Sequence, residues 1–388
     1  MASLAGEAFF IQKDLSGGNM AQRLPILFNK KPCYDIVFSK SFDDLWFDLA
    51  ELGIENRRVM IITDSNVRPL YAEELLNQLQ DKCMKASIFS FEAGEASKTL
   101  DTAKEAYKAL IAEGFDRKDL LLAVGGGVVG DVTGYVAATY LRGVDYVQIP
   151  TTLLSQADSS IGGKTGVDFD GYKNMVGAFK MPVLVYVNLS TLMSLSGRQY
   201  FNGFAEIMKH GLIKDASFYE WLISNMYEIC ERDLEVVEEM IIQSCTIKKL
   251  VVEKDPLEQG ERRLLNFGHT IGHAIEKAKG FELLHGECVA LGCVAAAHIS
   301  YKRDMITLDE YLEIRDMFVP FYLPITIEDI DPEEILAITK SDKKMEAGKI
   351  SFVLLKRIGK SMVDTTVKEE EVMAAIREIH FSEEDMKE

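Results

Sequence analysis

The stretch Leu120-Leu-Leu-Ala-Val-Gly-Gly-Gly-Val-Val-Gly-Asp131 joins a short apolar run to a glycine-rich turn. The apolar run is typical of a buried strand, and a helix-like segment follows the glycines at 132–140. Glycines at a strand-to-helix turn let backbone N–H groups approach a pyrophosphate, and the helix N-terminus adds partial positive charge there. A tight structural turn is the alternative, because the spacing is not the GxGxxG of an ordinary Rossmann unit.

Short apolar runs recur on both sides of this stretch. They alternate with amphipathic segments, and this alternation predicts a parallel sheet wrapped by helices. Such a sheet binds ligands beyond the carboxyl ends of its strands. The other runs lie at 34–38, 59–63, 86–89, 146–149 and 183–187.

The pattern changes near residue 190, where long helical periods replace the short runs. A small hairpin is predicted late in the chain, from the run at 349–355 and the segment 362–364. We therefore expect an α/β plus α protein, with a lead-in over 1–30, an α/β domain over 31–190 and a mostly helical domain over 191–388. The predicted helices lie at 198–212, 217–229, 234–253, 267–279 and 285–302.

The composition is that of a folded protein of one large or two ordinary domains, with 388 residues, 47% of them hydrophobic and 27% charged. The 61 acidic and 43 basic residues give a net charge of -18, which disfavours a nucleic-acid partner. A phosphate-bearing ligand then needs a local cluster of Lys and Arg.

No membrane partner is expected, because the longest stretch of small apolar residues, 288–297, is far shorter than the roughly 20 residues of a membrane span. The first residues lack the pattern of a signal peptide. The six cysteines form no CxxC pair and lie in apolar contexts, which indicates a reducing compartment. We expect a cytoplasmic protein.

Three of the six histidines, His269, His273 and His285, lie close together in the sequence. His269 and His273 are four residues apart, which places both imidazoles on one helix face with the spacing of metal ligands. A carboxylate completes a three-ligand site, and Glu206 lies on an apolar helix where an unbound acid is costly. The alternative is a His-rich helix start with a surface pair of Glu206 and Lys209.

Polar residues follow two of the predicted strands. Asp64 and Asn66 close the strand at 59–63, where they can hold a ribose hydroxyl or an adenine, and a helix N-cap is equally consistent with them. Glu95 and Lys98 follow the strand at 86–89, where they can contact a ribose, with a capping box as the alternative.

Basic and amide side chains crowd the same motifs. The segment Gly162-Gly-Lys-Thr165 lacks the GxxxxGK spacing of a P-loop, so nucleotide hydrolysis is rejected. Any single lysine is more often a solvated surface residue, but so much positive charge beside metal-type motifs predicts a substrate with both a phosphate and a carboxylate. The residues are Arg142, Lys164, Lys173, Asn174, Lys209, Lys248, Arg262 and Asn266.

Together these motifs resemble the 3-dehydroquinate synthase family, the NAD- and zinc-dependent cyclases of the shikimate pathway, within the sugar phosphate cyclases. The resemblance spans about residues 30–365. It is carried by Gly125-Gly-Gly-Val-Val-Gly-Asp-Val-Thr-Gly134, Arg142-Gly143, Pro150-Thr-Thr-Leu-Leu154, Asp158-Ser-Ser-Ile-Gly-Gly-Lys-Thr165, Lys173-Asn174, Glu206-Ile-Met-Lys209, the segment 262–273 and His285-Gly-Glu287.

The resemblance implies an N-terminal Rossmann-like NAD-binding domain, a helical metal- and substrate-binding domain, an active site in the cleft between them and a homodimer. The implied metal is Zn²⁺ or Co²⁺. The implied reaction converts 3-deoxy-D-arabino-heptulosonate 7-phosphate to 3-dehydroquinate and phosphate. It is a lyase reaction of aromatic amino acid biosynthesis, in which NAD is reduced and then regenerated within one turnover.

The resemblance also implies roles for individual residues. Glu206, His269 and His285 ligate the metal. NAD is held by Asp64, Asn66, Glu95, Lys98, Gly125, Gly126, Gly127, Asp131, Thr151, Thr152, Lys164 and Lys173. Substrate hydroxyls and proton transfers involve Asp158, Lys209, Lys248, Glu258, Asn266 and His273. The phosphate is held by Lys164, Asn174 and an Arg142 that reaches across the dimer interface, and the carboxylate by Arg262 with Lys343 or Lys344.

Two alternatives share parts of this pattern. Glycerol-dehydrogenase-like alcohol dehydrogenases share the architecture and the Gly-Gly-Gly loop, but net oxidation of a small polyol has no use for Arg262, Lys248 and Lys164 together. Sibling sugar phosphate cyclases act on glucose 6-phosphate or sedoheptulose 7-phosphate. These substrates lack the carboxylate, so such enzymes are expected to change the carboxylate-binding positions, whereas this chain keeps Arg262, Lys248, Asn266 and His273.

Overall fold

The computed structural model describes residues 21–280, 282–341, 345–346 and 349–381. The chain divides into two compact units, residues 1–194 and 195–388, and each is described by itself below. Lys343 and Lys344 lie outside the described residues, as do residues 1–20 of the expected lead-in.

The first unit is built on a seven-stranded sheet with the strand order β1-β2-β9-β6-β5-β3-β4. Neighbouring strands from β2 to β4 are parallel, and β1 pairs antiparallel with β2. The six predicted strands and their parallel arrangement are confirmed. The strands are β1 Gln22–Phe28, β2 Lys31–Ser39, β3 Arg58–Asp64, β4 Lys85–Phe91, β5 Leu120–Gly125, β6 Asp145–Pro150 and β9 Leu184–Asn188.

Strand β1 lies inside the segment that the sequence analysis treats as a lead-in, so the sheet begins earlier in the chain than expected. The strand buries Leu24 and Ile26 and leaves their neighbours half-exposed, which is the alternation of an antiparallel edge strand. Pro25 lacks a backbone N–H and obscures this short pattern, yet proline is tolerated on an edge strand.

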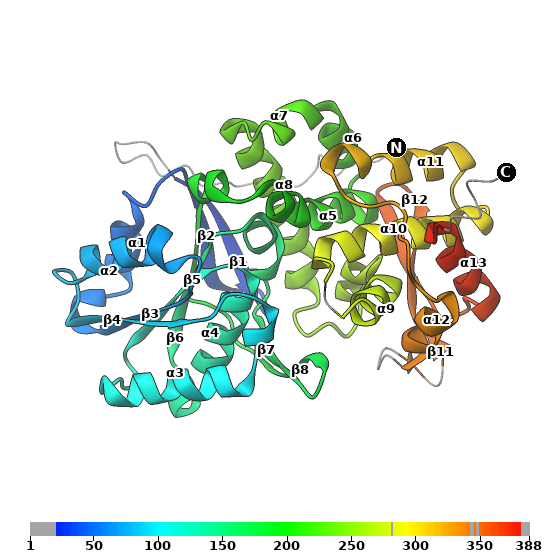
Figure 1. Cartoon of the computed structure of the whole chain (residues 1–388). Coiled ribbons are helices and arrows are strands. Elements are labelled where there is room, and N and C mark those ends of the chain that lie inside the picture. The colour runs from blue at the N-terminus through cyan, green and yellow to red at the C-terminus, as the bar shows by residue number, and fades with distance from the viewer. Residues whose placement is uncertain (1–20, 281, 342–344, 347–348, 382–388) are drawn as a thin grey trace. The chain divides into compact units, whose positions relative to one another are not determined.

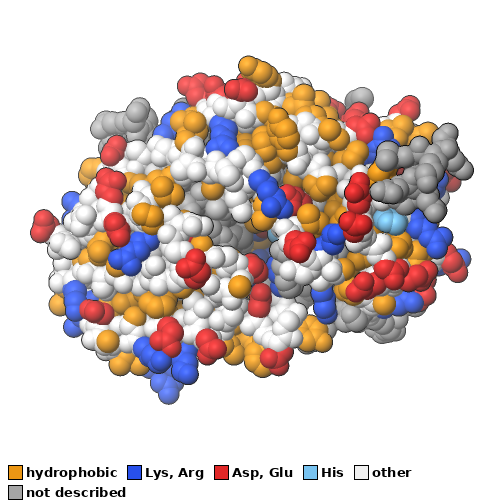
Figure 2. Space-filling view, viewed as in Figure 1, with side chains coloured by type: hydrophobic (Ala, Val, Ile, Leu, Met, Phe, Trp, Pro, Cys, Tyr) orange, Lys and Arg blue, Asp and Glu red, His pale blue; other side chains and the backbone are white. Residues whose placement is uncertain are grey.

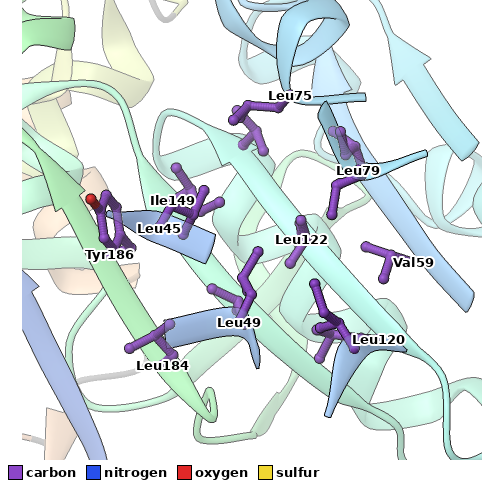
Figure 3. Packing of buried hydrophobic residues seen from close by; sticks show 14 of the residues in the cluster. Leu45, Leu49, Val59, Leu75, Leu79, Leu120, Leu122, Ile149, Leu184 and Tyr186 are labelled. Carbon is purple, nitrogen blue, oxygen red and sulfur yellow. The ribbon is translucent and has the colours of Figure 1, made fainter. Parts of the chain in front are cut away.

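Helices cover both faces of this sheet (Figure 1). The parallel strands are buried on both sides, so successive residues of β3 enter different clusters: Val59 and Ile61 pack in one, Met60 and Ile62 in the other. Figure 3 shows the first cluster, in which Leu45 and Leu75 from helices meet strand residues. The helices are α1 Leu45–Glu51 and α2 Glu73–Leu79 on this face, and α3 Leu100–Ala112 and α4 Gly127–Thr139 on the other.

A separate antiparallel hairpin, β7 Lys164–Phe169 and β8 Tyr172–Phe179, was not predicted from the sequence. Burial along β8 varies only between exposed and half-buried side chains, so the strand has no fully buried face. The hairpin carries Lys164, Lys173 and Asn174, three of the residues expected in a site.

The second unit is mostly helical. The segment expected as one helix at 217–229 is two, because the chain breaks at Asn225 between α6 and α7. The predicted hairpin is confirmed as β12 Phe352–Arg357 paired antiparallel with β13 Lys360–Asp364. The helices are α5 Gly197–Lys214, α6 Ala216–Ser224, α7 Met226–Cys230, α8 Leu234–Lys254, α9 His269–Ala278, α10 His285–Lys302, α11 Leu308–Asp316, α12 Pro332–Ser341 and α13 Glu369–Ile379, with the short strands β10 Met345–Glu346 and β11 Lys349–Ile350.

Helix α10 is the core of this unit, since its residues from Gly286 to Ser300 are buried without interruption. It packs closely on α9 through small residues. A Cβ added to Gly292 would lie 1.8 Å from the carbonyl oxygen of Gly268, and one added to Gly272 would lie 2.6 Å from that of Cys288. Only glycine fits at these two positions, so the two helices approach backbone to backbone.

On the surface, acidic and basic side chains are interspersed across the visible face of each unit (Figure 2). Among the described residues, no helix combines the length and the apolar character that crossing a membrane requires.

Candidate active site

Three side chains of the second unit converge in the arrangement of a metal site. Glu206 comes from α5, His269 from the first residue of α9 and His285 from the first residue of α10. Oε1 of Glu206 lies 3.3 Å from Nε2 of His269 and 3.2 Å from Nε2 of His285. The three ligand atoms lie within 4.8 Å of one another. Two imidazoles and one carboxylate form the donor set of a catalytic Zn²⁺ or Co²⁺ site that keeps open positions.

The start of α10 is held by one face of α5, the face that also carries Glu206. Arg198 donates from Nε and Nη2 to the two carboxylate oxygens of Glu287, at 2.7 and 2.8 Å. One turn further along α5, Oδ1 of Asn202 accepts the backbone N–H of Gly286 at 2.5 Å. His285, which precedes Gly286, is the third residue of the group formed with Glu206 and His269, so α5 sets the position of His285.

The electrostatics of Glu206 and His269 suit a cation, whereas His285 must release a proton before it can bind one. Burial opposes ionisation of Glu206, but its ion pair with Lys209 and its contact with His269 hold the pKa of Glu206 well below its ordinary value. Burial lowers the pKa of His269 to about 4, which leaves that imidazole neutral near pH 7. Burial also disfavours the charged form of His285, but the hydrogen bond to Glu206 and the carboxylate of Glu276, 3.8 Å from Nδ1, raise the pKa of His285 to about 9.

Other residues predicted for a site lie on the same unit. The ring of His273 lies 5.0 Å from that of His269 and 5.9 Å from that of His285, measured between centroids. Nδ2 of Asn266 donates to Oε1 of Glu258 at 3.0 Å. The structure therefore places His273 beside the group of Glu206, His269 and His285, and it pairs Asn266 with Glu258.

Two cationic side chains of this unit are buried. Arg262 is 2% exposed and Lys248 on α8 is 6% exposed. The loop before Arg262 is organised by Asp255, whose Oδ2 accepts the N–H of Gly260 at 2.7 Å and that of Arg262 at 3.0 Å. Nη1 of Arg262 donates to the carbonyl of Pro256 at 2.6 Å. Burying such groups is expensive, and the carboxylate of Asp255 is one charge that stabilises Arg262.

In the first unit, the glycine-rich turn joins β5 to α4 as predicted. Gly126 occupies the N-cap of α4. A Cβ at Gly126 would lie 3.1 Å from Thr152, and one at Gly127 would lie 3.2 Å from Ser159. The backbone N–H of Thr151 donates to the carbonyl of Gly125 at 3.0 Å, which ties the ends of β5 and β6 together. Backbone donors at a helix start are a site for an anionic group.

Charged residues after β4, in the first turns of α4 and on the β7–β8 hairpin form one network. Nζ of Lys98 lies 2.5 Å from Oδ2 of Asp131, and Nζ of Lys173 lies 3.1 Å from Oε1 of Glu95. Although burial disfavours its charged form, Asp131 and Glu95 raise the pKa of Lys98, so it is a fixed cation. The backbone N–H of Asn174, which has φ of 52°, donates to Asp168 at 2.8 Å.

The remaining predicted residues of the first unit are less enclosed. Oδ1 of Asp64 accepts the N–H groups of Asn66 and Val67, both at 2.9 Å, so Asp64 closes the turn after β3. The helical turn Arg68–Ala72 that follows has Val67 as its N-cap residue, so Asp64 is not the helix N-cap that was the alternative to ribose binding. Lys164 is exposed at the start of β7, and Asp158 is half-buried in the helical turn Ser155–Ser159. Arg142 is exposed in a left-handed turn with φ of 70°.

Comparison with models of protein families shows to which family the chain belongs. Residues 88–202 match the model described as "3-dehydroquinate synthase N-terminal", and residues 203–345 match "3-dehydroquinate synthase C-terminal". The chain belongs to the 3-dehydroquinate synthase family. The glycine-rich turn lies in the first matched segment and the Glu206, His269 and His285 group in the second.

Individual proteins that are similar to this chain support the same family. A 3-dehydroquinate synthase of Acetivibrio thermocellus is 45% identical over 320 residues, which cover 82% of this chain and 89% of the relative. Among solved structures, a 2-epi-5-epi-valiolone synthase from Streptomyces hygroscopicus subsp. jinggangensis, with NAD⁺ and Zn²⁺ bound, is 29% identical with a TM-score of 0.82, over 89% of this chain and 96% of that one. A 2-deoxy-scyllo-inosose synthase, 24% identical over 92% of this chain and 99% of that one, shares the fold with a TM-score of 0.82.

The sequence did not predict several residues that lie near the group of Glu206, His269 and His285 or near the ion pairs of the first unit. Glu276 is 2% exposed and lies beside His285. It follows His269 by seven residues, so helical spacing could have revealed it. Asn202 and Arg198 precede Glu206 by four and eight residues, which is again one helix face. Asp168 had no such signal, because the hairpin that carries it was not predicted.

Proposed function

We propose that this chain is a 3-dehydroquinate synthase, which converts 3-deoxy-D-arabino-heptulosonate 7-phosphate to 3-dehydroquinate and phosphate in the cytoplasm. The observation that carries the proposal is the group of Glu206, His269 and His285 in one unit with two buried cations, Arg262 and Lys248. A metal site alone fits many alcohol substrates. Buried cations in the same unit fit a substrate that is itself a carboxylate and a phosphate ester.

The cofactors of the proposal are NAD and one Zn²⁺ or Co²⁺ ion. The donor set fits the cation, because Nε2 of His269 and Nε2 of His285 both face one buried carboxylate oxygen of Glu206, and a neutral imidazole can bind a metal through that nitrogen. When bound, NAD accepts and returns a hydride, and the cation polarises the substrate oxygens.

Residues of the first unit would bind NAD. The N–H groups at Gly126 and Gly127 begin α4 and would meet the pyrophosphate. The other residues of this role are Gly125, Thr151 and Thr152 at the adjoining strand ends, Asp64 and Asn66 after β3, and the ion-paired Glu95, Lys98, Asp131 and Lys173.

Residues of the second unit would orient the substrate. Lys209 keeps an ammonium beside Glu206 and can donate a hydrogen bond to a substrate oxygen near the cation. Arg262 would bind the carboxylate, since its planar guanidinium matches that group. Lys248, Glu258, Asn266 and His273, with Asp158 of the first unit, would hold hydroxyls and assist proton transfers.

The phosphate would be bound by Lys164 and Asn174 of the β7–β8 hairpin. We include Arg142 of the partner subunit in this role, and with it a homodimer. Arg142 is exposed and held in a left-handed conformation, so its side chain is available outside its own unit's core.

The test is release of inorganic phosphate from 3-deoxy-D-arabino-heptulosonate 7-phosphate with catalytic rather than stoichiometric NAD. We expect many phosphates released per NAD and none from glucose 6-phosphate or sedoheptulose 7-phosphate. Stoichiometric consumption of NAD would indicate an alcohol dehydrogenase instead. Release from either control sugar would indicate a sibling cyclase.

Arg262→Ala sharpens the same test. Removing one partner of a desolvated charge pair typically costs about 2 to 5 kcal/mol, so kcat/KM for the carboxylate substrate should fall steeply. Binding of an analogue without the carboxylate should change little. Equal weakening of both ligands would mean that Arg262 holds the phosphate or the fold.

A further inference from the structure

Glu276 is a buried acid to which the proposed function gives no role. It lies on α9, its side chain is 3% exposed, and it is therefore far from the aqueous environment that an ionised carboxylate prefers. It follows His269 by seven residues and so lies on the same side of α9 as that residue. A buried carboxylate on this side of the helix needs a cation or a hydrogen-bond donor to stabilise it.

The imidazole of His285 lies between two carboxylates. Its Nε2 lies 3.2 Å from Oε1 of Glu206, and its Nδ1 lies 3.8 Å from Oε1 of Glu276. The two ring nitrogens thus face different partners: Nε2 faces the group that would hold the cation, and Nδ1 faces α9. A neutral imidazole that gives the Nε2 lone pair to a cation must carry its proton on Nδ1.

The second histidine of the group shows the same division of its nitrogens. Nε2 of His269 lies 3.3 Å from Oε1 of Glu206, and its Nδ1 lies 3.1 Å from the carbonyl oxygen of Phe267. Each histidine therefore turns Nε2 to Glu206 and Nδ1 toward an oxygen, which is within hydrogen-bond distance for His269 and 3.8 Å away for His285. For His269 the acceptor is a neutral backbone carbonyl, whereas for His285 it is a carboxylate.

We propose that Glu276 is a positioning residue that acts on the metal through His285: it accepts the Nδ1–H, fixes the ring and its tautomer, and strengthens Nε2 as a ligand. Such outer-shell acceptors typically change metal affinity about 10-fold to 100-fold. The carboxylate also adds negative charge near the cation, where Lys209 already offsets the charge of Glu206. This inference rests on the metal role given to Glu206, His269 and His285 in the proposed function.

The experiment measures the dissociation constant and stoichiometry of Zn²⁺ by chelator competition on the full-length apoprotein, and the visible absorption spectrum of the Co²⁺ form. Glu276→Gln keeps an acceptor oxygen without the charge and should weaken binding about 10-fold, while Glu276→Leu removes the acceptor and should weaken it about 100-fold. Both should shift the Co²⁺ spectrum. The matched control is Ile275→Val, the preceding core residue of α9, which should lower thermal stability without changing affinity or spectrum.

Wild-type affinity and spectrum in both Glu276 variants would overturn the proposal. So would a wild-type stoichiometry of two ions with the second lost in Glu276→Gln, because Glu276 would then be a ligand together with His273 and His285. If Glu276→Leu does not fold, Glu276→Gln still decides, since it preserves size and hydrogen-bonding shape. Failure of the metal site itself appears separately, as unchanged Zn²⁺ affinity in Glu206→Ala.

Discussion

Oδ1 of Asn202 accepts the backbone N–H of Gly286 at 2.5 Å, and this contact joins α5 to the first turn of α10. The first N–H groups of a helix have no partner within the helix. The N-cap residue of α10 is Leu284, whose side chain has no acceptor, so Asn202 supplies from another helix what a local cap would supply. Because His285 precedes Gly286, the same contact fixes the position of a proposed metal ligand.

Asn202→Ala should therefore weaken both the helix start and the metal site. Loss of a cap typically costs about 1 kcal/mol, and a displaced ligand lowers metal affinity. We expect a lower Tm in the apoprotein and a larger Zn²⁺ dissociation constant by chelator competition. Asn202→Asp keeps the accepting oxygen and is the matched variant. If both variants bind Zn²⁺ like wild type, Asn202 does not position the ligand.

Gly292→Ala tests the close approach of α9 and α10. The added methyl would lie 1.8 Å from the carbonyl oxygen of Gly268, and a backbone atom cannot rotate away. Overpacking of this kind costs about 1 to 3 kcal/mol, so we expect a clear fall in Tm and weaker Zn²⁺ binding, since His269 and His285 begin these helices. Gly197→Ala is the control, because a Cβ at that helical position meets nothing within 4 Å. A fall in Tm as large in the control would show that the packing argument is wrong.

The ion pair of Arg303 with Glu371 should make stability depend on pH. Nε and Nη2 of Arg303 lie 2.6 and 2.7 Å from the two carboxylate oxygens, and this hydrogen bonding holds the pKa of Glu371 below its ordinary value. A carboxyl with a depressed folded-state pKa stabilises the fold above its unfolded pKa, about 4.3 for Glu, and loses that contribution as the pH falls through the folded value.

Glu371→Gln should accordingly lower Tm at pH 7, for a loss of about 1 kcal/mol, and the difference from wild type should shrink at pH 3.5. Glu333→Gln is the control. Its carboxylate lies 3.9 Å from Arg377 and both side chains are more than two-thirds exposed, so Tm should not change at either pH. A Glu371→Gln deficit that persists undiminished at pH 3.5 would refute the linkage.

The elements that the sequence predicted are those whose pattern is local. The apolar run at 120–124 identifies β5 because a central parallel strand is buried on both faces. The spacing of His269 and His273 identifies one helix face, and the structure adds Glu206 from a helix distant in sequence.

The elements that escaped prediction depend on tertiary contacts. Strand β8 has no buried face of its own to leave an alternating pattern, so its residues read as a loop. Glu276 shares a helix face with His269, and Asn202 shares one with Glu206, but their contacts with α10 form only when α9 and α5 pack against that helix. Asp64 shows the converse: its sequence suits both a ribose contact and a helix N-cap, and the structure shows that it closes a turn before Val67 becomes the N-cap residue.

The shared phosphate site of the proposed homodimer has a test of its own. A two-fold contact is reciprocal, so an Arg142 that serves the other subunit does so in both directions. Inactive Arg142→Ala and inactive Glu206→Ala chains are unfolded together and refolded as an equal mixture. Random pairing then makes about half of the dimers mixed.

In each mixed dimer, the chain that keeps Glu206 receives an intact Arg142 from its neighbour and has one complete site, whereas the other site lacks both groups. About a quarter of wild-type activity should return from two parents that each have little. Each parent refolded alone is the control for recovery during refolding. If Arg142 serves its own chain, every site in the mixture carries one lesion and no activity returns. That result would show that Arg142 does not act in the partner's site. It would not bear on the group of Glu206, His269 and His285, which is tested by its metal affinity.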